Sequence, residues 1–279
     1  MFDCTGITCP HDALPLKNIE GQLRCENGHS FDLAKQGYCN LLPVQAKRSR
    51  DPGDSKAMIA ARSELLDSGV YQGIADKLCE LVAELGTGKS LAIADAGCGE
   101  GYYLKALESH LQQADLAARM IGFDISKWAV ARACKRSRSV SWLVASSKQP
   151  PLADRSLDLI LCMFGYTQYP QFASKLTQGG HLLLVDAGPD HLLELRRNIY
   201  QEIKPHRNFD TAQAEQAGFE LISTHSLRQQ VTLNQAQLQQ LMLMTPHFFR
   251  AKAEAKQQLA ELEELTLTLD VEYRLFRCM

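Results

Sequence analysis

The 279-residue chain has no long hydrophobic run and no strong excess of either charge. No apolar stretch approaches the roughly 20 residues that a bilayer-spanning helix needs, so we expect no membrane partner. The 30 Lys and Arg residues nearly balance the 32 Asp and Glu residues, giving a formal net charge of −2. Nucleic-acid binding would therefore need a local basic patch. The first residues lack the basic and apolar regions of a signal peptide, which predicts a cytoplasmic protein with reduced cysteines.

Four of the nine cysteines lie in the first 45 residues, a turn-rich segment with few large apolar side chains. Cys25 and His29 have three residues between them, and Cys4 and Cys9 have four, which suits a tetrahedral zinc site. A metal would also help so small a segment to fold. A second ligand set is open, because Cys9-Pro-His-Asp12 resembles a Cys-x-x-Cys knuckle with Asp12 in the second cysteine's place. The alternative is a group of unrelated reduced thiols beside a surface histidine.

A glycine-dense turn, Ala94-Asp-Ala-Gly-Cys-Gly-Glu-Gly101, follows an apolar run and precedes a segment patterned like a helix. Glycines let the backbone approach a ligand closely, and a helix start presents unpaired N–H groups. Asp95 and Glu100 would repel a phosphate, whereas a carboxylate beside a methionine ammonium or a ribose hydroxyl is useful. The turn therefore predicts a site for S-adenosylmethionine rather than a dinucleotide. The glycines expected to hold this cofactor are Gly97, Gly99 and Gly101.

Asp124 completes this pattern, because it ends a second apolar run and lies 27 positions after Gly97. In a βαβ unit, an acid at the tip of the second strand reaches the ribose hydroxyls of a nucleoside bound at the first turn. Small residues in a strand–helix turn are often only packing, and a lone Gly-x-Gly-x-Gly is a weak signal. Together the two motifs indicate a cofactor-binding α/β domain.

Hydrophobic patterning predicts strands that alternate with helices. The expected strands are 91–95, 119–124, 140–145, 157–163 and 179–185, with two further β-like runs near 221–233 and 265–276. The expected helices are 55–66, 71–85, 102–111, 127–136, 233–244 and 249–265. Five alternating strands followed by a terminal pair are typical of an α/β fold with a Rossmann-like class I methyltransferase sheet.

Residues 46–56 are polar and contain a Pro-Gly break, which predicts a linker or loop. We therefore expect a small zinc-ribbon-like domain over residues 1–45. A methyltransferase domain is expected over residues 57–279.

Several stretches of the chain resemble one family. They are His29-Ser-Phe-Asp-Leu-Ala-Lys-Gln-Gly-Tyr38 after the cysteine knuckle, Asn40-Leu-Leu-Pro-Val-Gln45, Lys47-Arg-Ser-Arg-Asp-Pro-Gly-Asp54 and Gly97-Cys-Gly-Glu-Gly-Tyr-Tyr103. The likeness continues through Val144–Ser147 and Gly188–Leu192 to Met244–Pro246 and so covers nearly the whole chain. The sequence resembles the RlmA family of 23S rRNA (guanine-N1)-methyltransferases, and the stretch from Lys47 to Asp54 is the most specific part of the match.

The resemblance implies methyl transfer from S-adenosylmethionine to N1 of a guanine in a 23S rRNA stem-loop. It also implies that the zinc-binding domain helps to recognise the RNA. The chain could act as a monomer or as a homodimer. The family's cofactor contacts map to Gly99 and Glu100 in the glycine turn, to Tyr71 and to His191. The chain departs from the family in its cysteine knuckle and after the fourth strand, at residues 164–170.

Lys47, Arg48 and Arg50 form a basic cluster between the two expected domains. RNA would be clamped at such a hinge, so we expect these side chains to contact its phosphates. The alternative is an ordinary solvated loop, which most short charge runs are.

Guanine N1 carries a proton at neutral pH, and this proton must leave before the nitrogen can attack a methyl group. A general base or donors to O6 are therefore needed. The loops after the fourth and fifth strands offer Tyr166, Tyr169, Asp186 and His191, of which Tyr166 and Asp186 are the catalytic candidates. The two tyrosines could instead stack on an extruded base or pack in the protein.

Two other kinds of function are consistent with the residues. The fold hosts many acceptors, so the substrate could be a small molecule or a protein. A cofactor-binding regulator without catalysis, with zinc serving partner docking, belongs to a different class.

Overall fold

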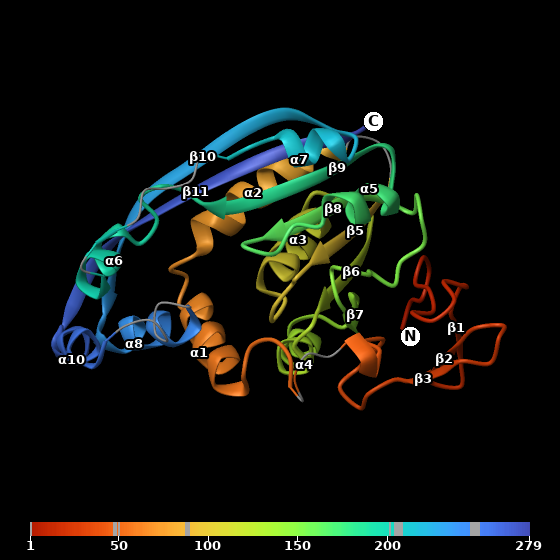
Figure 1. The fold of residues 1–279 in the computed structure, drawn as a ribbon, viewed down its shortest axis with the longest axis horizontal. Helices are drawn as coiled ribbons and strands as arrows, with labels where there is room; N and C mark the ends of the chain where they lie inside the picture. Colours follow the sequence, from red (N-terminus) through yellow and green to blue (C-terminus); the bar gives the residue numbers. More distant parts are fainter. Residues whose placement is uncertain are drawn as a thin grey trace.

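The computed structural model describes residues 2–46, 49, 51–86, 90–200, 202–203, 209–245 and 252–279. Eight strands form one sheet in the order β10-β11-β9-β8-β5-β6-β7-β4, and a second sheet has the order β1-β2-β3 (Figure 1). The strands are β1 (Lys17–Ile19), β2 (Gln22–Arg24), β3 (Ser30–Asp32), β4 (Tyr38–Asn40), β5 (Leu91–Ala96), β6 (Ala118–Asp124), β7 (Ser141–Val144), β8 (Leu157–Met163), β9 (Leu176–Ala187), β10 (Phe219–Asn234) and β11 (Glu264–Cys278).

Helices connect most of these strands. They are α1 (Lys56–Asp67), α2 (Gln72–Leu85), α3 (Tyr102–Gln113), α4 (Lys127–Arg136), α5 (Tyr169–Lys175), α6 (Leu193–Ile199), α7 (Ala212–Gln216), α8 (Gln235–Met244) and α10 (Ala253–Glu261). Capping side chains define the N-termini of several of these helices. Ser55 and Ser126 each accept a hydrogen bond from the backbone N–H of the third residue of their helix, and Asn234 and Gln237 form a capping box at α8.

The large sheet is mostly parallel. The strands β4, β7, β6, β5, β8 and β9 run in one direction, and β11 pairs antiparallel with both β9 and β10. The five alternating strands and the terminal pair predicted from the sequence are confirmed. The fold class, an α/β sheet of the class I methyltransferase kind, is therefore confirmed as well.

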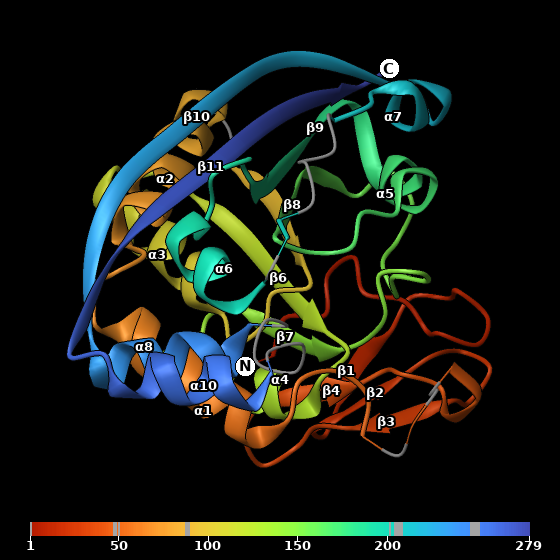
Figure 2. The same ribbon diagram turned by 60° about the vertical axis from the view of Figure 1, so that its left-hand side comes forward.

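The helices α2, α3, α4 and α6 cover one face of the sheet. Side chains from these helices join one hydrophobic cluster with Ile93 and Leu159 of the sheet; examples are Leu78, Leu107, Val130 and Leu195. The opposite face is covered by α5, α7 and the N-terminal segment, which contribute Phe172, Ala214, Ile7, Leu16 and Leu23 to a second cluster. The N-terminal segment thus completes a three-layer arrangement (Figure 2).

The sequence did not predict that the N-terminal segment would enter the large sheet. Its strand β4 pairs in parallel with β7, so Cys39 lies opposite Leu143. The backbone N–H of Thr8 also donates to the carbonyl of Pro151 at 2.9 Å. Because paired residues of β4 and β7 are 104 positions apart in sequence, as Tyr38 and Trp142 are, hydrophobic periodicity could not reveal their pairing.

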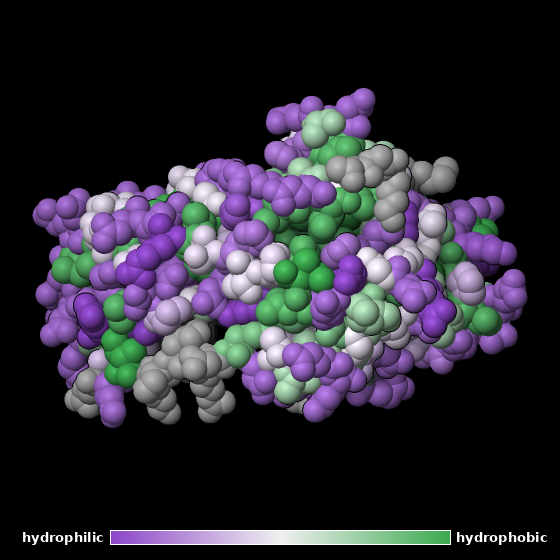
Figure 3. All heavy atoms as spheres, turned by 90° about the horizontal axis from the view of Figure 1, so that it is seen from above, coloured by the Kyte–Doolittle hydropathy of each residue, from purple (hydrophilic) through white to green (hydrophobic). Residues whose placement is uncertain are grey.

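The outer edge of the large sheet is β10. Seen from above, this side of the molecule is largely hydrophilic, with hydrophobic residues exposed in a smaller area near its middle (Figure 3). Leu221 and Ile222 of β10 are 38% and 44% exposed. Among the described residues, no helix is both long and apolar enough to cross a membrane.

If the N-terminal segment shares the core of the sheet, a cavity in it should destabilise the whole chain. Leu23 is fully buried, whereas Ile19 in the same hairpin is 46% exposed. We expect Leu23→Ala to lower the free energy of unfolding by about 2–5 kcal/mol and Ile19→Ala by about 0.5 kcal/mol or less. Denaturant unfolding followed by circular dichroism measures both. A separate early transition for the N-terminal segment in Leu23→Ala, with the main transition unmoved, would contradict this prediction.

Candidate active site

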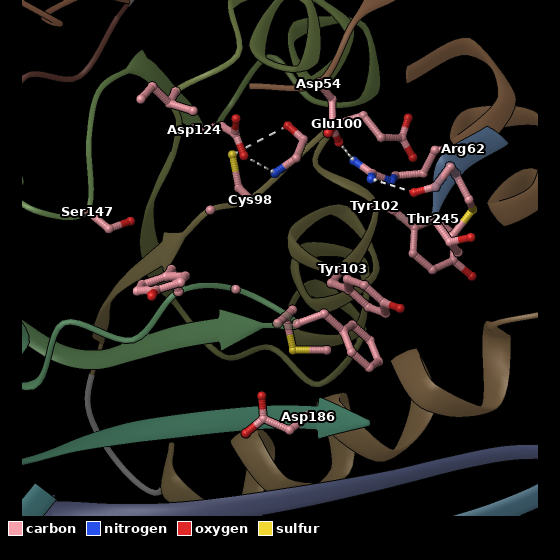
Figure 4. A pocket seen from close by; sticks show the side chains of 18 of the residues that line it. Asp54, Arg62, Cys98, Glu100, Tyr102, Tyr103, Asp124, Ser147, Asp186 and Thr245 are labelled. Atoms are coloured by element: carbon pink, nitrogen blue, oxygen red, sulfur yellow. Dashed lines mark hydrogen bonds and ion pairs between the residues drawn. The ribbon is translucent and has the colours of Figure 1, made fainter. Parts of the chain in front are cut away.

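A cleft with a cavity volume of about 770 Å³ lies at the carboxyl ends of β5, β6, β8 and β9. In open parallel sheets such a crevice forms where the chain order reverses. Here β5 is that point, because the chain continues from β5 to β6 on one side and later returns to β8 on the other. We call the part lined by the ends of β5 and β6 the nucleoside half, and the part lined by the ends of β8 and β9 the acceptor half (Figure 4).

The glycine turn forms the floor of the nucleoside half. Gly97, Gly99 and Gly101 all have positive φ angles, of 81°, 54° and 79°, which L side chains rarely adopt. Gly97 and Gly99 line the cleft, and a Cβ on Gly97 would meet nothing within 4 Å. Gly101 lies away from the cleft, where an added Cβ would be 2.6 Å from Trp142. Two glycines of the motif thus open the site, and the third allows the helix to pack on the sheet.

Asp124 stands at the tip of β6 and lines the cleft, as its spacing predicted. Its Oδ2 accepts from the backbone N–H of Gly99 at 3.1 Å, and its Oδ1 accepts from that of Ser126 at 2.7 Å. Burial raises the pKa of this carboxyl, and the two N–H donors oppose the shift. The two bonds fix the carboxyl group beside the glycine turn, where each oxygen can accept a second bond from a ribose hydroxyl.

Asp95 is buried beneath the turn and does not line the cleft. Its Oδ1 has no hydrogen-bond partner among the described residues. Burial, with the nearby Asp124 carboxylate as a second cause, raises the pKa of Asp95 to about 8. At neutral pH the folded protein therefore holds this carboxyl group mostly in its protonated form.

Glu100 also lies in the turn, and its carboxylate is directed into the protein. Arg136 of α4 donates to it twice, at 2.9 Å and 2.7 Å, and Ser63 of α1 donates to it as well. The side chain is 1% exposed, so this charge is fully paired in the interior. Glu100 is also among the residues that line the cleft, so its predicted cofactor contact stays a prediction, while its carboxylate connects α1, the turn and α4.

Arg62 of α1 joins two segments that lie over the nucleoside half. One of its nitrogens is 2.5 Å from Oδ2 of Asp54, and another donates to the carbonyl of Met244 at 3.2 Å (Figure 4). Asp54 is held in turn by Ser126, whose hydroxyl donates to its carbonyl at 2.8 Å. The end of the linker is therefore docked on the turn that carries Asp124.

The acceptor half brings together most of the residues expected after the fourth and fifth strands. Tyr166, Asp186 and His191 all line the cleft. Tyr71, expected to contact the cofactor, lines it from the start of α2. Tyr169 does not, because its ring packs against Phe219 and Phe276 in the core. Of the alternatives considered for Tyr169, packing inside the protein is the one that agrees with its position.

A separate cluster of metal-ligand side chains lies in the N-terminal segment. Ligand atoms of Cys9, Asp12, Cys25 and His29 all lie within 4.8 Å of one another. His29 Nδ1 is 3.5 Å from Cys9 Sγ, 3.4 Å from Cys25 Sγ and 3.0 Å from Asp12 Oδ2. Donor atoms around tetrahedral zinc are separated by roughly 3.2–3.8 Å, so this geometry fits the ion.

Cys4 lies outside this cluster. It packs at the margin of the second hydrophobic cluster, and Ile7 donates its backbone N–H to the Cys4 carbonyl. The structure thus brings together the second ligand set, in which Asp12 replaces Cys4 as the fourth ligand. Asp12 is held for this role by Leu14, whose backbone N–H donates to Oδ1, and by Asn27, whose amide donates to Oδ2.

Lys47, Arg48 and Arg50 lie outside the described residues, so their predicted RNA contacts rest on the sequence alone. Other cleft residues were not anticipated as ligand contacts. Asp54 and Ser146 belong to stretches that resemble the family, which is the signal that could have marked them. The sequence did not indicate Arg62 as a residue of the site, because an arginine on an amphipathic helix usually faces solvent.

Comparisons with known proteins agree with this site. The family model described as "Methyltransferase domain" matches residues 93–178, which include the glycine turn and Asp124. The model "RlmA, N-terminal", a zinc ribbon, matches residues 7–50. The fold and the cleft thus define a class I methyltransferase that carries an N-terminal zinc ribbon.

Curated relatives give the family. The chain is 33% identical over 270 residues to the 23S rRNA (guanine(748)-N(1))-methyltransferase of Streptomyces fradiae, covering 94% of each chain. It is 32% identical to YxjB of Bacillus subtilis (strain 168), named as a candidate 23S rRNA (guanine-N(1)-)-methyltransferase, over 98% of this chain and 95% of that protein. The chain belongs to the family of 23S rRNA (guanine-N1)-methyltransferases.

The buried acid beneath the turn predicts a pH-dependent stability. The folded-state pKa of Asp95, about 8, lies above the usual value of 3.8 for an aspartic acid, so the folded state binds this proton more tightly. The free energy of unfolding should therefore fall as the pH rises from 4 to 8. In Asp95→Asn this fall should be smaller by an amount on the order of 1–4 kcal/mol.

Urea unfolding at several pH values measures the effect. The control is Asp115→Asn, the same exchange at an exposed position. Equal pH slopes for the wild type and Asp95→Asn would show that the buried carboxyl is not the cause.

Proposed function

We propose that this protein transfers the methyl group of S-adenosylmethionine to N1 of a guanine in a 23S rRNA stem-loop. The observation that carries the proposal is the single cleft with two chemically different halves. The nucleoside half has open glycines and a fixed carboxylate, and the acceptor half has aromatic rings and a second carboxylate. The named activities of the family relatives supply the substrate class.

The nucleoside half suits S-adenosylmethionine, which supplies a methyl group on a positively charged sulfur. Asp124 would accept from the ribose hydroxyls, and Gly97 and Gly99 would let the backbone approach the cofactor. Tyr71 and His191 border the cleft where the family places cofactor contacts. In an in-line displacement the main task of these groups is alignment.

Asp186 is the side chain best suited to receive the N1 proton. A carboxylate can accept from both N1–H and the neighbouring amino group of guanine, so it also recognises the base. Arg274 of β11, 7% exposed, lies 3.3 Å from Oδ2 of Asp186. This ion pair holds the Asp186 carboxyl group in a defined position at the end of β9. His191 is less suited, because its Nδ1 already accepts from the backbone N–H of Asp270 at 3.3 Å.

The zinc ligands in this proposal are Cys9, Asp12, Cys25 and His29. The ion would hold the N-terminal segment in shape, as structural zinc does in small modules. That module, residues 1–45, would present RNA-binding surface next to the methyltransferase domain at 57–279. The basic side chains of the linker 46–56 would contact phosphates; they are Lys47, Arg48 and Arg50.

We infer a cytoplasmic site of action, because the proposed substrate is ribosomal RNA. The partner is the large-subunit rRNA. Self-association into a homodimer stays a prediction, and sedimentation of the purified protein at several concentrations tests it.

Labelled S-adenosylmethionine tests the reaction. We expect the purified protein to transfer label to unmodified 23S rRNA and to leave unmodified tRNA and a protein extract unlabelled. Label in the protein extract or in tRNA would favour a different acceptor. Cofactor binding without label in any acceptor would favour the regulator without catalysis.

Metal content distinguishes the two ligand sets. We expect one zinc per chain in the wild type and in Cys4→Ser, and a loss of roughly tenfold or more in zinc affinity in Asp12→Ala. The reverse substitution, Asp12→Cys, should bind zinc more tightly, because thiolates are strong zinc ligands. Mass spectrometry under native conditions and competition with a chelator measure both quantities. Zinc loss in Cys4→Ser with retention in Asp12→Ala would establish the first set instead.

A further inference from the structure

Phe164 has an unusual backbone for a large side chain. It directly follows β8 and has a φ of 52°, in the left-handed region that a residue with a Cβ rarely adopts. The next residue, Gly165, is closely packed, because an added Cβ there would lie 2.9 Å from Cys162 Sγ and 3.2 Å from the carbonyl of Ala96. The N–H of Phe164 also donates to the carbonyl of Val185 at 2.7 Å. Such strain persists only where the surroundings enforce it, and it is common at functional sites.

This backbone places the Phe164 side chain in the cleft instead of the core. The residue lines the cleft and remains 39% exposed. Its ring centroid is 6.4 Å from that of Tyr103 and 5.9 Å from that of His191, with ring planes tilted by 44° and 33°. Both neighbouring rings are tilted relative to Phe164 and do not stack flat on it, so part of its ring surface stays exposed.

The position of Phe164 is in the acceptor half. It follows β8, on the side of β5 opposite to β6 and Asp124. Its hydrogen bond to Val185 also puts its backbone next to Asp186, the proposed proton acceptor. A flat base lying on this ring would therefore have an acidic group within reach of its edge.

The other aromatic candidates are less suitable as a fixed platform. Tyr166 is 82% exposed, so its ring has little protein around it to hold its orientation. Tyr169 is 9% exposed and packed in the core. Phe164 alone of these three combines an exposed ring with an enforced backbone.

We propose that Phe164 is the platform on which the target guanine stacks when it is extruded from the RNA. The inference rests on the proposed function and deepens it by naming a positioning residue for the acceptor base. Enzymes that act on a base take it out of the helix and commonly hold it against aromatic side chains. The strained backbone is the feature that keeps the ring available for this contact.

Kinetics with the full-length protein and 23S rRNA test the proposal. Loss of one base–aromatic stack should raise the KM for RNA or lower kcat/KM about 5- to 150-fold in Phe164→Ala. Phe164→Leu, apolar but without a ring face, should show a similar loss. Phe164→Tyr and Phe164→Trp should retain most of the activity. The Kd for S-adenosylmethionine should change much less than the RNA kinetics in all four variants, because Gly97, Gly99 and Asp124 lie on the other side of β5 and only His191 adjoins Phe164.

Phe164→Gly separates function from folding. Glycine relieves the left-handed strain, so its Tm should equal or exceed that of the wild type while RNA methylation falls. A fluorescent purine analogue in place of the target guanine gives a direct signal. Its emission should be quenched by the wild type, Phe164→Tyr and Phe164→Trp but not by Phe164→Leu.

Three results would overturn the proposal. The first is unchanged RNA kinetics in Phe164→Leu alongside an active wild type, which would leave the proposed function standing. The second is a lower Tm of Phe164→Gly with normal methylation, which would make Phe164 a structural residue. The third is the absence of rRNA methylation by the wild type, which would remove both the platform and the proposed function.

Discussion

The paired, buried carboxylate of Glu100 is the constraint on which the cleft depends. Its two oxygens accept from Arg136 at 2.7 Å and 2.9 Å, and its side chain is 1% exposed. Removing Arg136 would leave the buried Glu100 carboxylate without its closest cation, which is strongly destabilising, whereas Arg136 also pairs with Asp67. Since Ser63 also donates to Glu100, the contact joins α1 and α4 to the glycine turn. The position of that turn, and of α1 above it, follows from this one interaction.

The same scaffold connects the proposed RNA-binding segment with the cofactor site. Arg62 directly precedes Ser63 in α1 and pairs with Asp54 at the end of the linker. Asp54 is bonded in turn to Ser126, next to the strand tip that carries Asp124. The end of the linker is therefore connected through hydrogen bonds to the strand tip that lines the nucleoside half. In the acceptor half, the ends of β8 and β9 place Phe164 beside Asp186, so chemistry and base positioning come from neighbouring strands.

Local patterns were enough to predict much of this structure. The alternating apolar runs located the strands, and the spacing of Gly97 and Asp124 located the nucleoside half, because both depend on residues close in sequence. Features that depend on distant contacts escaped prediction. These include the pairing of β4 with β7, the inward direction of Glu100, and the choice of Asp12 rather than Cys4 in the metal cluster. The left-handed backbone of Phe164 also escaped prediction, because a phenylalanine gives no sequence signal for this conformation.

The identity of the methylated atom tests the central claim most directly. Unmodified 23S rRNA is incubated with the protein and S-adenosylmethionine, digested to nucleosides and analysed by mass spectrometry against the isomeric methylguanosines. The account predicts 1-methylguanosine as the new product, located at one position where reverse transcription stops because the Watson–Crick edge is blocked. A methyl group on N2 or N7 of guanine, or on another base, would contradict an acceptor site built to remove the N1 proton.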